Sequence, residues 1–335
     1  MIFYITFLRF LAALLITNSH FGAIYPRGSF ACGGMLGNLI FFAVSGYCLY
    51  HVRGNFWRWY GQRLLRIYPA VVIVTLFGIL IGYHWGALTW ELVLRLFVYP
   101  TYYHFIAAIV VLYVVFYFLM KLPDFRLLGI DKLAWLSLVV FALYLTMYIS
   151  FYDKTVYHIE HVDEAGTGQK FPWFIFGESM LLGAMFRKYD HYFRVRRFHL
   201  ARDSFLMLFF AVGYAAVRFL LKMGKIPGEY QILSPIFLYL LTAALFWSAS
   251  SLDRALERWR GSNRSAGRVV ETISNLTLEI YLVQFAVIAF VLKWSKVSFP
   301  LNWLVCVATI LLEAALVHWV ASRVTAPLIR VLKRQ

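Results

Sequence analysis

Charged residues are scarce in this sequence of 335 residues. Only 14% of the residues are Asp, Glu, Lys or Arg, whereas 62% are hydrophobic and 19% are aromatic, and the mean hydropathy is +0.70. A water-soluble fold has too little interior to bury so much apolar surface, which excludes a soluble globular protein. The composition therefore predicts an integral membrane protein.

Cysteine is also scarce. The three cysteines, Cys32, Cys48 and Cys306, are scattered and odd in number, which excludes a disulfide framework and a metal knuckle. The sequence lacks internal repeats, low-complexity tracts and an appended soluble domain, so we expect a single domain over residues 1–335. No small-residue cleavage site follows the first apolar run, and we expect that run to be a membrane helix rather than a cleaved signal peptide.

Ten apolar runs are long enough to cross the roughly 30 Å hydrocarbon core of a bilayer. They cover residues 2–21, 36–52, 67–84, 104–121, 133–151, 171–187, 204–221, 234–251, 272–292 and 302–321. The sequence therefore predicts an all-α membrane protein, a bundle of about ten transmembrane helices.

The connecting segments alternate in positive charge. Those after the second, fourth, sixth and eighth runs and the C-terminal tail hold 22 Lys and Arg, counted with Lys121 and Arg187 at the ends of two runs, against 8 in the other segments. Cytoplasmic loops carry the excess of positive charge in membrane proteins, so we expect both termini to be cytoplasmic. This asymmetry also accounts for the net charge of +16 without a nucleic-acid partner.

The first apolar run carries two ionisable residues, Arg9 and His20. Eleven residues of α-helix return to within about 20° of the same face and rise about 16 Å, so both side chains face one way at different depths. Buried ionisable residues in a membrane are costly and usually mark a functional site, although an arginine also snorkels to the interface and a histidine also ends a helix.

Two arginines precede the third run. Arg63 and Arg66 are three residues apart in a basic, aromatic and amphipathic stretch that continues into Ile67 and Pro69. Such a stretch suits an interfacial helix that binds anionic lipid, and the paired guanidinium groups also suit bidentate binding of phosphate. In the second run, Ser45 and Gly46 interrupt a bulky face and indicate close helix packing.

Three acidic residues lie within the predicted spans: Glu178, Glu279 and Glu313, the last in the cytoplasmic half of the tenth span. Glu178 lies one to two turns below the outer surface, and it requires either a partner or protonation. Glu279 lies in the cytoplasmic third, level with Arg9, so that an ion pair between them would satisfy both charges.

The sequence gives only weak indications of a metal site. His20, His84 and His104 are expected at one outer level but have no flanking carboxylates, so we interpret them as residues of the interfacial aromatic belt. The acidic loop at residues 153–170 is flanked by glycine and predicts a solvated lid over an outer cleft rather than a cation site. We therefore expect no metal.

Five features of the chain together resemble one family, the acyltransferase-3 family of integral-membrane O-acyltransferases. They are the spacing of Arg9 and His20, FFAVSGY at Phe41–Tyr47, RLLRIYP at Arg63–Pro69, FPWFIFGESMLLG at Phe171–Gly183 and ISNLTLEIYLVQ at Ile273–Gln284. Two positions depart from the family pattern: Gln284 stands where many relatives have histidine, and His104 with Phe105 replaces a Trp-Phe-Leu start.

The resemblance implies an O-acetyltransferase-like enzyme of the plasma (inner) membrane. It would transfer an acyl group, most commonly acetyl, from cytoplasmic acyl-CoA to a hydroxyl of an extracytoplasmic glycan or lipid-linked saccharide. His20 would be the general base, in direct transfer or through an acyl-histidine, and Arg9 would hold the pantetheine or thioester region. Arg63 and Arg66 would bind the CoA phosphates. Ser45 and Tyr281 are weaker candidates for residues that line the channel.

Two other classes of function fit the same residues. A transporter or flippase of an acylated or glycan-linked substrate also needs buried charge and helices interrupted by glycine, although the sequence shows no paired halves. A structural subunit of an export complex is the third class, and it would tolerate replacement of Arg9 and His20.

Overall fold

The computed structural model describes residues 2–82, 89–100, 103–151, 171–294 and 297–334, with the side chains of residues 151 and 329–334 left out. Helices form nearly all of it. The longer ones are α1 (Phe3–His20), α2 (Gly34–Leu49), α3 (Phe56–Leu80), α5 (His104–Lys121), α6 (Lys132–Phe151), α7 (Phe171–Lys188), α9 (Leu200–Lys222), α10 (Leu233–Ser251), α13 (Thr277–Trp294) and α14 (Leu301–Arg334). The shorter ones are η1 (Phe21–Ala23), η2 (Gly28–Phe30), α4 (Trp90–Val93), η3 (Leu94–Val98), α8 (Asp190–Val195), η5 (Gly228–Ile232), α11 (Asp253–Ser262) and α12 (Arg264–Asn275).

Each of the ten predicted spans overlaps one of the longer helices. In the described part of the chain, nine helices are long and apolar enough to cross a membrane. The remaining one, α7, has 18 residues but carries three charges, at Glu178, Arg187 and Lys188. The predicted class, an all-α multi-pass membrane protein, is confirmed, and α7 as a tenth span stays a prediction.

The chain divides into two compact units. Unit 1 contains Met1–Ala12, Met35–His51 and Phe118–Gly267, and unit 2 contains Ala13–Gly34, Val52–Tyr117 and Arg268–Gln335. Helix α1 therefore contributes its first half to unit 1 and its second half to unit 2. The expected single domain over residues 1–335 stays a prediction.

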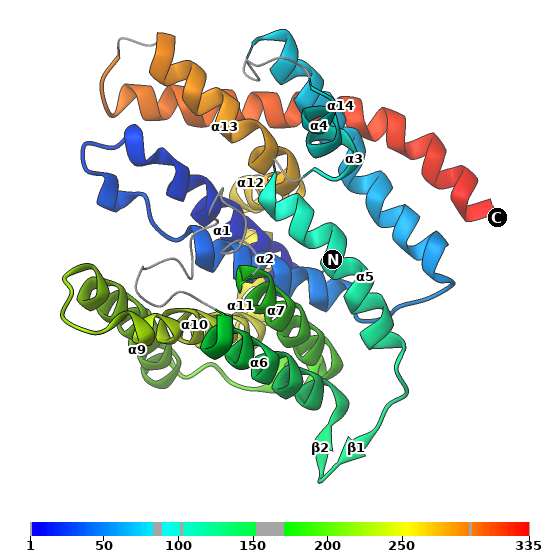
Figure 1. The fold of residues 1–335 in the computed structure, drawn as a ribbon, viewed down its shortest axis with the longest axis vertical. Helices are drawn as coiled ribbons and strands as arrows, with labels where there is room; N and C mark the ends of the chain where they lie inside the picture. The colour runs from blue at the N-terminus through cyan, green and yellow to red at the C-terminus, as the bar shows by residue number, and fades with distance from the viewer. Residues whose placement is uncertain (1, 83–88, 101–102, 152–170, 295–296, 335) are drawn as a thin grey trace. The chain divides into compact units, whose positions relative to one another are not determined.

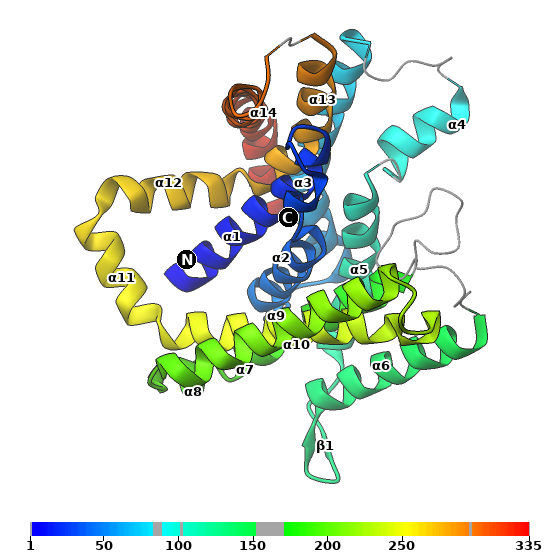
Figure 2. The same ribbon diagram turned by 90° about the vertical axis from the view of Figure 1, so that its left-hand side faces the viewer.

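In unit 1, α6 packs on α7 and α9 packs on α10 (Figure 2). Helices α2 and α7 touch through backbone, because a Cβ atom added at Gly46 would overlap the carbonyl oxygen of Met180. A Cβ atom added at Gly183 would overlap that of Ala43. The close packing predicted at Gly46 is thereby confirmed, and only glycine fits at these two contacts.

A two-stranded hairpin precedes α6 in unit 1. Strand β1 (Arg126–Leu127) pairs antiparallel with β2 (Ile130–Asp131). Leu128 and Gly129 between them both have positive φ, 53° and 77°, as a two-residue turn of type I′ requires. Lys188 at the end of α7 bonds Asp131 with a distance of 2.5 Å between Nζ and Oδ2, which ties α7 to the hairpin.

In unit 2, α14 packs against both α3 and α13 (Figure 1). Helix α3 begins where the side chain of Asn55 accepts a hydrogen bond from the backbone N–H of Arg58, and it continues through Pro69. The expected interfacial stretch and the third span are therefore one helix of 25 residues. The Thr325 hydroxyl of α14 donates to the carbonyl of Leu65 at 3.3 Å, so the two helices meet beside the paired arginines.

The ninth span begins later than the sequence predicts. The apolar run starts at residue 272, but α12 ends at Asn275 and α13 begins at Thr277. The Thr277 hydroxyl donates to the carbonyl of Ser274 at 2.7 Å, a local bond that competes with the continuation of the helix. Glu279 consequently lies in the first turn of α13.

Candidate active site

Helix α1 carries Arg9 and His20 without a break between them. Both side chains are half-buried, and the helical repeat places them on one face, about 16 Å apart along the axis. Arg9 belongs to unit 1 and His20 to unit 2. The continuity of α1 thus preserves the spacing that the sequence singles out.

The histidine is held by an aromatic neighbour from the same unit. Its ring meets the Phe285 ring of α13 nearly edge-on, with 4.4 Å between the ring centroids. Two residues before His20 in α1, the side-chain amide of Asn18 donates to the carbonyls of Phe30 and Cys32 and accepts from the Tyr25 hydroxyl at 2.6 Å. These bonds fold the segment after α1 back onto the helix end that presents His20.

Tyr281 has a structural role in the group of aromatic side chains around Phe285. Its ring lies 5.9 Å from Phe285 and 5.1 Å from Phe105, and its hydroxyl accepts from the backbone N–H of Phe105 at 3.4 Å. That N–H is in the first turn of α5, where helices have donors without an internal partner. Tyr281 therefore caps α5, and its suggested role in lining a channel stays a prediction.

Gln284, adjacent to Phe285, is fully buried. Neither atom of its amide group has a hydrogen-bond partner among the residues that the structure describes. A buried amide left unpaired is costly, so this position suits a bound water or a polar atom of a substrate. The sequence indicated it only as a departure from the family pattern.

A cavity adjoins this cluster within unit 2. Its volume is about 180 Å³, and Phe285, Tyr103 and Glu313 are among the residues that line it, together with apolar side chains of α3, α13 and α14. Phe285 therefore contacts His20 and also lines this cavity. Only Glu313, which is half-buried, brings a carboxyl group to the described lining of this cavity.

Glu279 is paired, but with a residue that the sequence did not suggest. Its Oε1 lies 2.8 Å from Nδ1 of His318 on α14. The Glu279 side chain is 7% exposed and that of His318 is 47% exposed. The predicted pair of Glu279 with Arg9 would join the two units and stays a prediction.

The paired arginines of α3 differ in exposure. Arg66 is exposed, whereas Arg63 is half-buried with its guanidinium 5.3 Å from the centre of the Trp59 ring. Arg66 is thus available to a phosphate group in solution, and Arg63 sits beside it against an aromatic face. Whether these residues bind phosphate stays a prediction.

Ser45 and Glu178 belong to unit 1. Ser45 is half-buried in α2, and nothing that the structure describes tests its role at a channel. Glu178 is buried in α7, and its Oε2 accepts a hydrogen bond of 2.5 Å from the Ser137 hydroxyl of α6. The partner that the sequence required for this carboxyl is therefore at least partly supplied by a serine.

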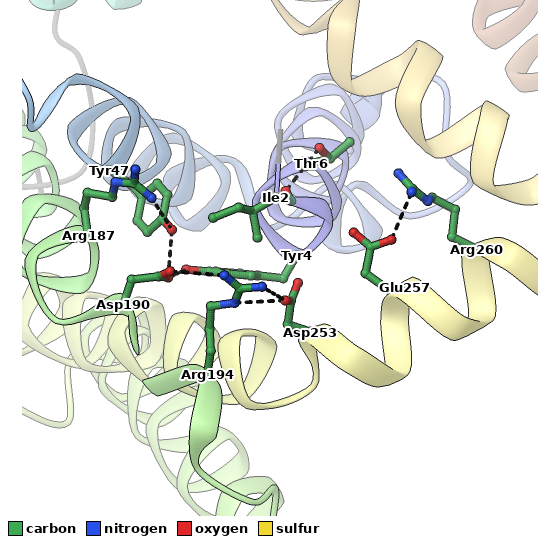
Figure 3. A network of polar contacts seen from close by, with 10 residues as sticks. All are labelled: Ile2, Tyr4, Thr6, Tyr47, Arg187, Asp190, Arg194, Asp253, Glu257 and Arg260. Carbon is green, nitrogen blue, oxygen red and sulfur yellow. Dashed lines mark hydrogen bonds and ion pairs between the residues drawn. The ribbon is translucent and has the colours of Figure 1, made fainter. Parts of the chain in front are cut away.

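A polar network in unit 1 escaped the sequence analysis. Asp190 accepts hydrogen bonds from the hydroxyls of Tyr4 at 2.9 Å and Tyr47 at 2.7 Å. Arg194 joins Asp190 to the buried Asp253, which it meets at 2.6 Å (Figure 3). The network ties the starts of α1, α8 and α11 to the end of α2. Tyr47, the last residue of FFAVSGY, therefore has a structural role that only its distant partners reveal.

No group of three His, Cys, Asp or Glu side chains gathers in the described ranges as a metal site would require. His84 and the loop at residues 153–170 lie outside the described residues, so the interfacial role of this histidine and the outer lid stay predictions. His104 begins α5.

The comparison with protein families gives one result. A family model described as an acyltransferase domain matches residues 2–319, which is nearly the whole chain and includes every stretch on which the resemblance rests. No curated protein and no solved structure matches the chain. The chain therefore belongs to the acyltransferase-3 family, and it is a multi-pass membrane acyltransferase.

Proposed function

We propose that this acyltransferase acts in the plasma membrane as an O-acyltransferase. It takes an acyl group, acetyl in the first instance, from cytoplasmic acyl-CoA and transfers it to a hydroxyl of an extracytoplasmic glycan or lipid-linked saccharide. The observation that carries the proposal is the unbroken helix α1, which presents Arg9 and His20 on one face at two depths. A pantetheine arm is long enough to cover the roughly 16 Å between them.

His20 is the general base in this proposal. Its imidazole takes the proton of the acceptor hydroxyl while the hydroxyl oxygen attacks the thioester carbonyl carbon, and the carbon–sulfur bond then breaks. The imidazolium returns the proton to the departing thiolate, so the histidine is unchanged after each turnover. Imidazole suits this exchange because it gains and loses a proton near neutral pH. The edge contact with Phe285 supports the proposal, since it restricts the orientation of the ring.

The donor is held at its phosphate end by Arg66 and Arg63 and along its pantetheine arm by Arg9. Arg66 fits this role because it is exposed on α3, and guanidinium groups bind phosphate through two parallel hydrogen bonds. The half-buried Arg9 fits the second position because a guanidinium group donates several hydrogen bonds, which the amide oxygens of a pantetheine arm can accept.

The test is single-turnover transfer from radiolabelled acetyl-CoA by the purified protein, with acetyl-CoA affinity measured by calorimetry. His20→Ala is expected to slow transfer by about 10²- to 10⁴-fold with nearly unchanged affinity, because a general base contributes to the transition state. Arg66→Ala and Arg63→Ala are expected to weaken binding by about 10- to 100-fold each. Arg9→Ala should lower both quantities.

His199→Ala is the matched control, because the His199 side chain is exposed before α9. A folded His20→Ala protein that transfers acetyl as fast as this control would remove the catalytic role of His20. Incubation with acetyl-CoA but without an acceptor distinguishes the two chemical routes, because only the acyl-histidine route leaves a His20-dependent label on the protein.

A further inference from the structure

A second cavity lies wholly within unit 1, where α6, α7 and α10 surround it. Its volume is about 230 Å³, and its wall is mostly aromatic and aliphatic, with Phe141, Phe174, Ile236 and Leu240 among the lining residues. An apolar cavity of about 150 Å³ holds benzene, so this one has room for a larger apolar molecule.

One acidic side chain lines this apolar cavity. Glu178 is 7% exposed, and it lies ten residues from the end of α7 at Lys188, which is about 15 Å into the helix. Ser137 bonds its Oε2 at 2.5 Å. Its Oε1 is buried and has no hydrogen-bond partner within the part of the chain that the structure describes.

The cavity offers no countercharge for this carboxyl group. The described residues that line it include no Lys, Arg or His, and the remaining polar groups are the hydroxyls of Ser137, Tyr144 and Tyr239. A buried carboxyl oxygen without a partner is unfavourable, and a ligand that bonds it while filling the apolar space removes both costs. The cavity therefore suits a ligand with one polar group and an apolar remainder.

From this we infer that the cavity binds a free aliphatic alcohol. A hydroxyl group donates to an ionised carboxylate and accepts from a protonated one, so it satisfies Oε1 in either state. An amine would bring a second charge into a mostly apolar wall, where the described side chains offer only three neutral hydroxyl groups to solvate it. None of the described residues that line this cavity has a role in the proposed acyl transfer.

The experiment uses a diazirine derivative of 1-octanol as a photolabel on the full-length protein in detergent, with labelled peptides identified by mass spectrometry. Label is expected on the segments of α6, α7 and α10 that line the cavity. Unlabelled 1-octanol should compete at least about tenfold more effectively than n-octane, because only the alcohol bonds Glu178. Equal competition by octane would overturn the role of Glu178, and stronger competition by octylamine would overturn the choice of an alcohol.

Three variants test the site itself. Glu178→Leu removes the polar group at similar size and should lower labelling by about tenfold, whereas Glu178→Gln keeps a donor and an acceptor and should label within about threefold of wild type. Ile236→Trp fills the space and should abolish labelling. Glu313→Leu, which alters a carboxyl of the other cavity, is the control and should change nothing.

Each variant is compared only after it elutes as a single folded species. A folded Glu178→Leu protein labelled like wild type would overturn the proposal. So would unchanged labelling of Ile236→Trp, or wild-type label found only outside the cavity. If Glu178→Leu fails to fold, the contrast between Glu178→Gln and Ile236→Trp with the octane competition decides instead.

Discussion

At the scale of single residues, the contact between Glu279 and His318 shows what sequence patterns leave open. The depth of Glu279 along its helix predicts which residues lie at the same level, but not which of them its side chain faces. Arg9 is the cation that the sequence predicts at the same depth in the membrane as Glu279. The observed partner, His318, is 39 residues from Glu279 in sequence and half-exposed on α14. A carboxylate and an imidazole 2.8 Å apart form a strong, charge-assisted hydrogen bond when the imidazole is protonated.

Removal of His318 should therefore destabilise the fold. His318→Ala leaves the buried Glu279 without this partner, which should cost about 1 to 3 kcal/mol, the usual penalty for a buried polar group that loses its hydrogen bond. Thermal unfolding in detergent measures it. The second change Glu279→Gln, which removes the charge, should recover part of the loss in the double variant. If His318→Ala unfolds at the same temperature as the exposed control His199→Ala, the contact contributes nothing to stability.

What the structure shows for each candidate residue depends on the kind of sequence evidence that indicated it. Arg9 and His20 were indicated by their rarity in an apolar run, and the structure keeps them on one continuous helix. Tyr281 was indicated only by the resemblance, and the structure gives its hydroxyl a backbone partner in α5. The bonds from Tyr4 and Tyr47 to Asp190 were missed because they join residues 186 and 143 positions apart, and spacing along a chain carries no signal over that range.

At the scale of helices, most of the fold followed from the sequence. All ten apolar runs became helices, because length and hydropathy alone decide that a segment spans a bilayer with its backbone bonded internally. Helix ends were less predictable. Pro69 did not end α3, while the break before Thr277 came from a serine carbonyl and a threonine hydroxyl in a sequence without proline or glycine.

The contact between α2 and α7 predicts that a single methyl group added at this contact lowers the stability of the protein strongly. Gly183→Ala places a Cβ atom into the carbonyl of Ala43, and neither backbone can yield without moving a helix. We expect destabilisation of about 1 to 3 kcal/mol or failure to fold, as overpacking of a tight interface produces. Gly61→Ala is the control, because a Cβ atom there meets nothing within 4 Å and alanine favours the helix by up to about 1 kcal/mol. Equal thermal stability of the two variants in detergent would show that α2 and α7 are not in backbone contact.

At the scale of the whole molecule, the direction of acyl transfer depends on how the bundle is oriented in the membrane. Helix packing is the same for either orientation, so the distribution of charge among the connecting segments has to supply this information. The distribution of 22 basic residues in one set of segments against 8 in the other predicts that both termini, the β1–β2 hairpin and the arginines of α3 are cytoplasmic. In this orientation the segment between α1 and α2 that follows His20 would be extracytoplasmic, where the acceptor is proposed to bind.

The native cysteines allow this orientation to be tested with few changes. Cys32 is exposed in the segment between α1 and α2, and after Cys48→Ser and Cys306→Ser it is the single thiol of the chain. A membrane-impermeant maleimide should label it on intact cells. Arg126→Cys, exposed in β1 and combined with Cys32→Ser on the same background, should react only after permeabilisation, because its segment belongs to the basic, cytoplasmic set. Labelling in the opposite order would reverse the bundle. His20 would then face the cytoplasm, and transfer from a cytoplasmic donor to an extracytoplasmic hydroxyl would no longer fit the depths of Arg9 and His20.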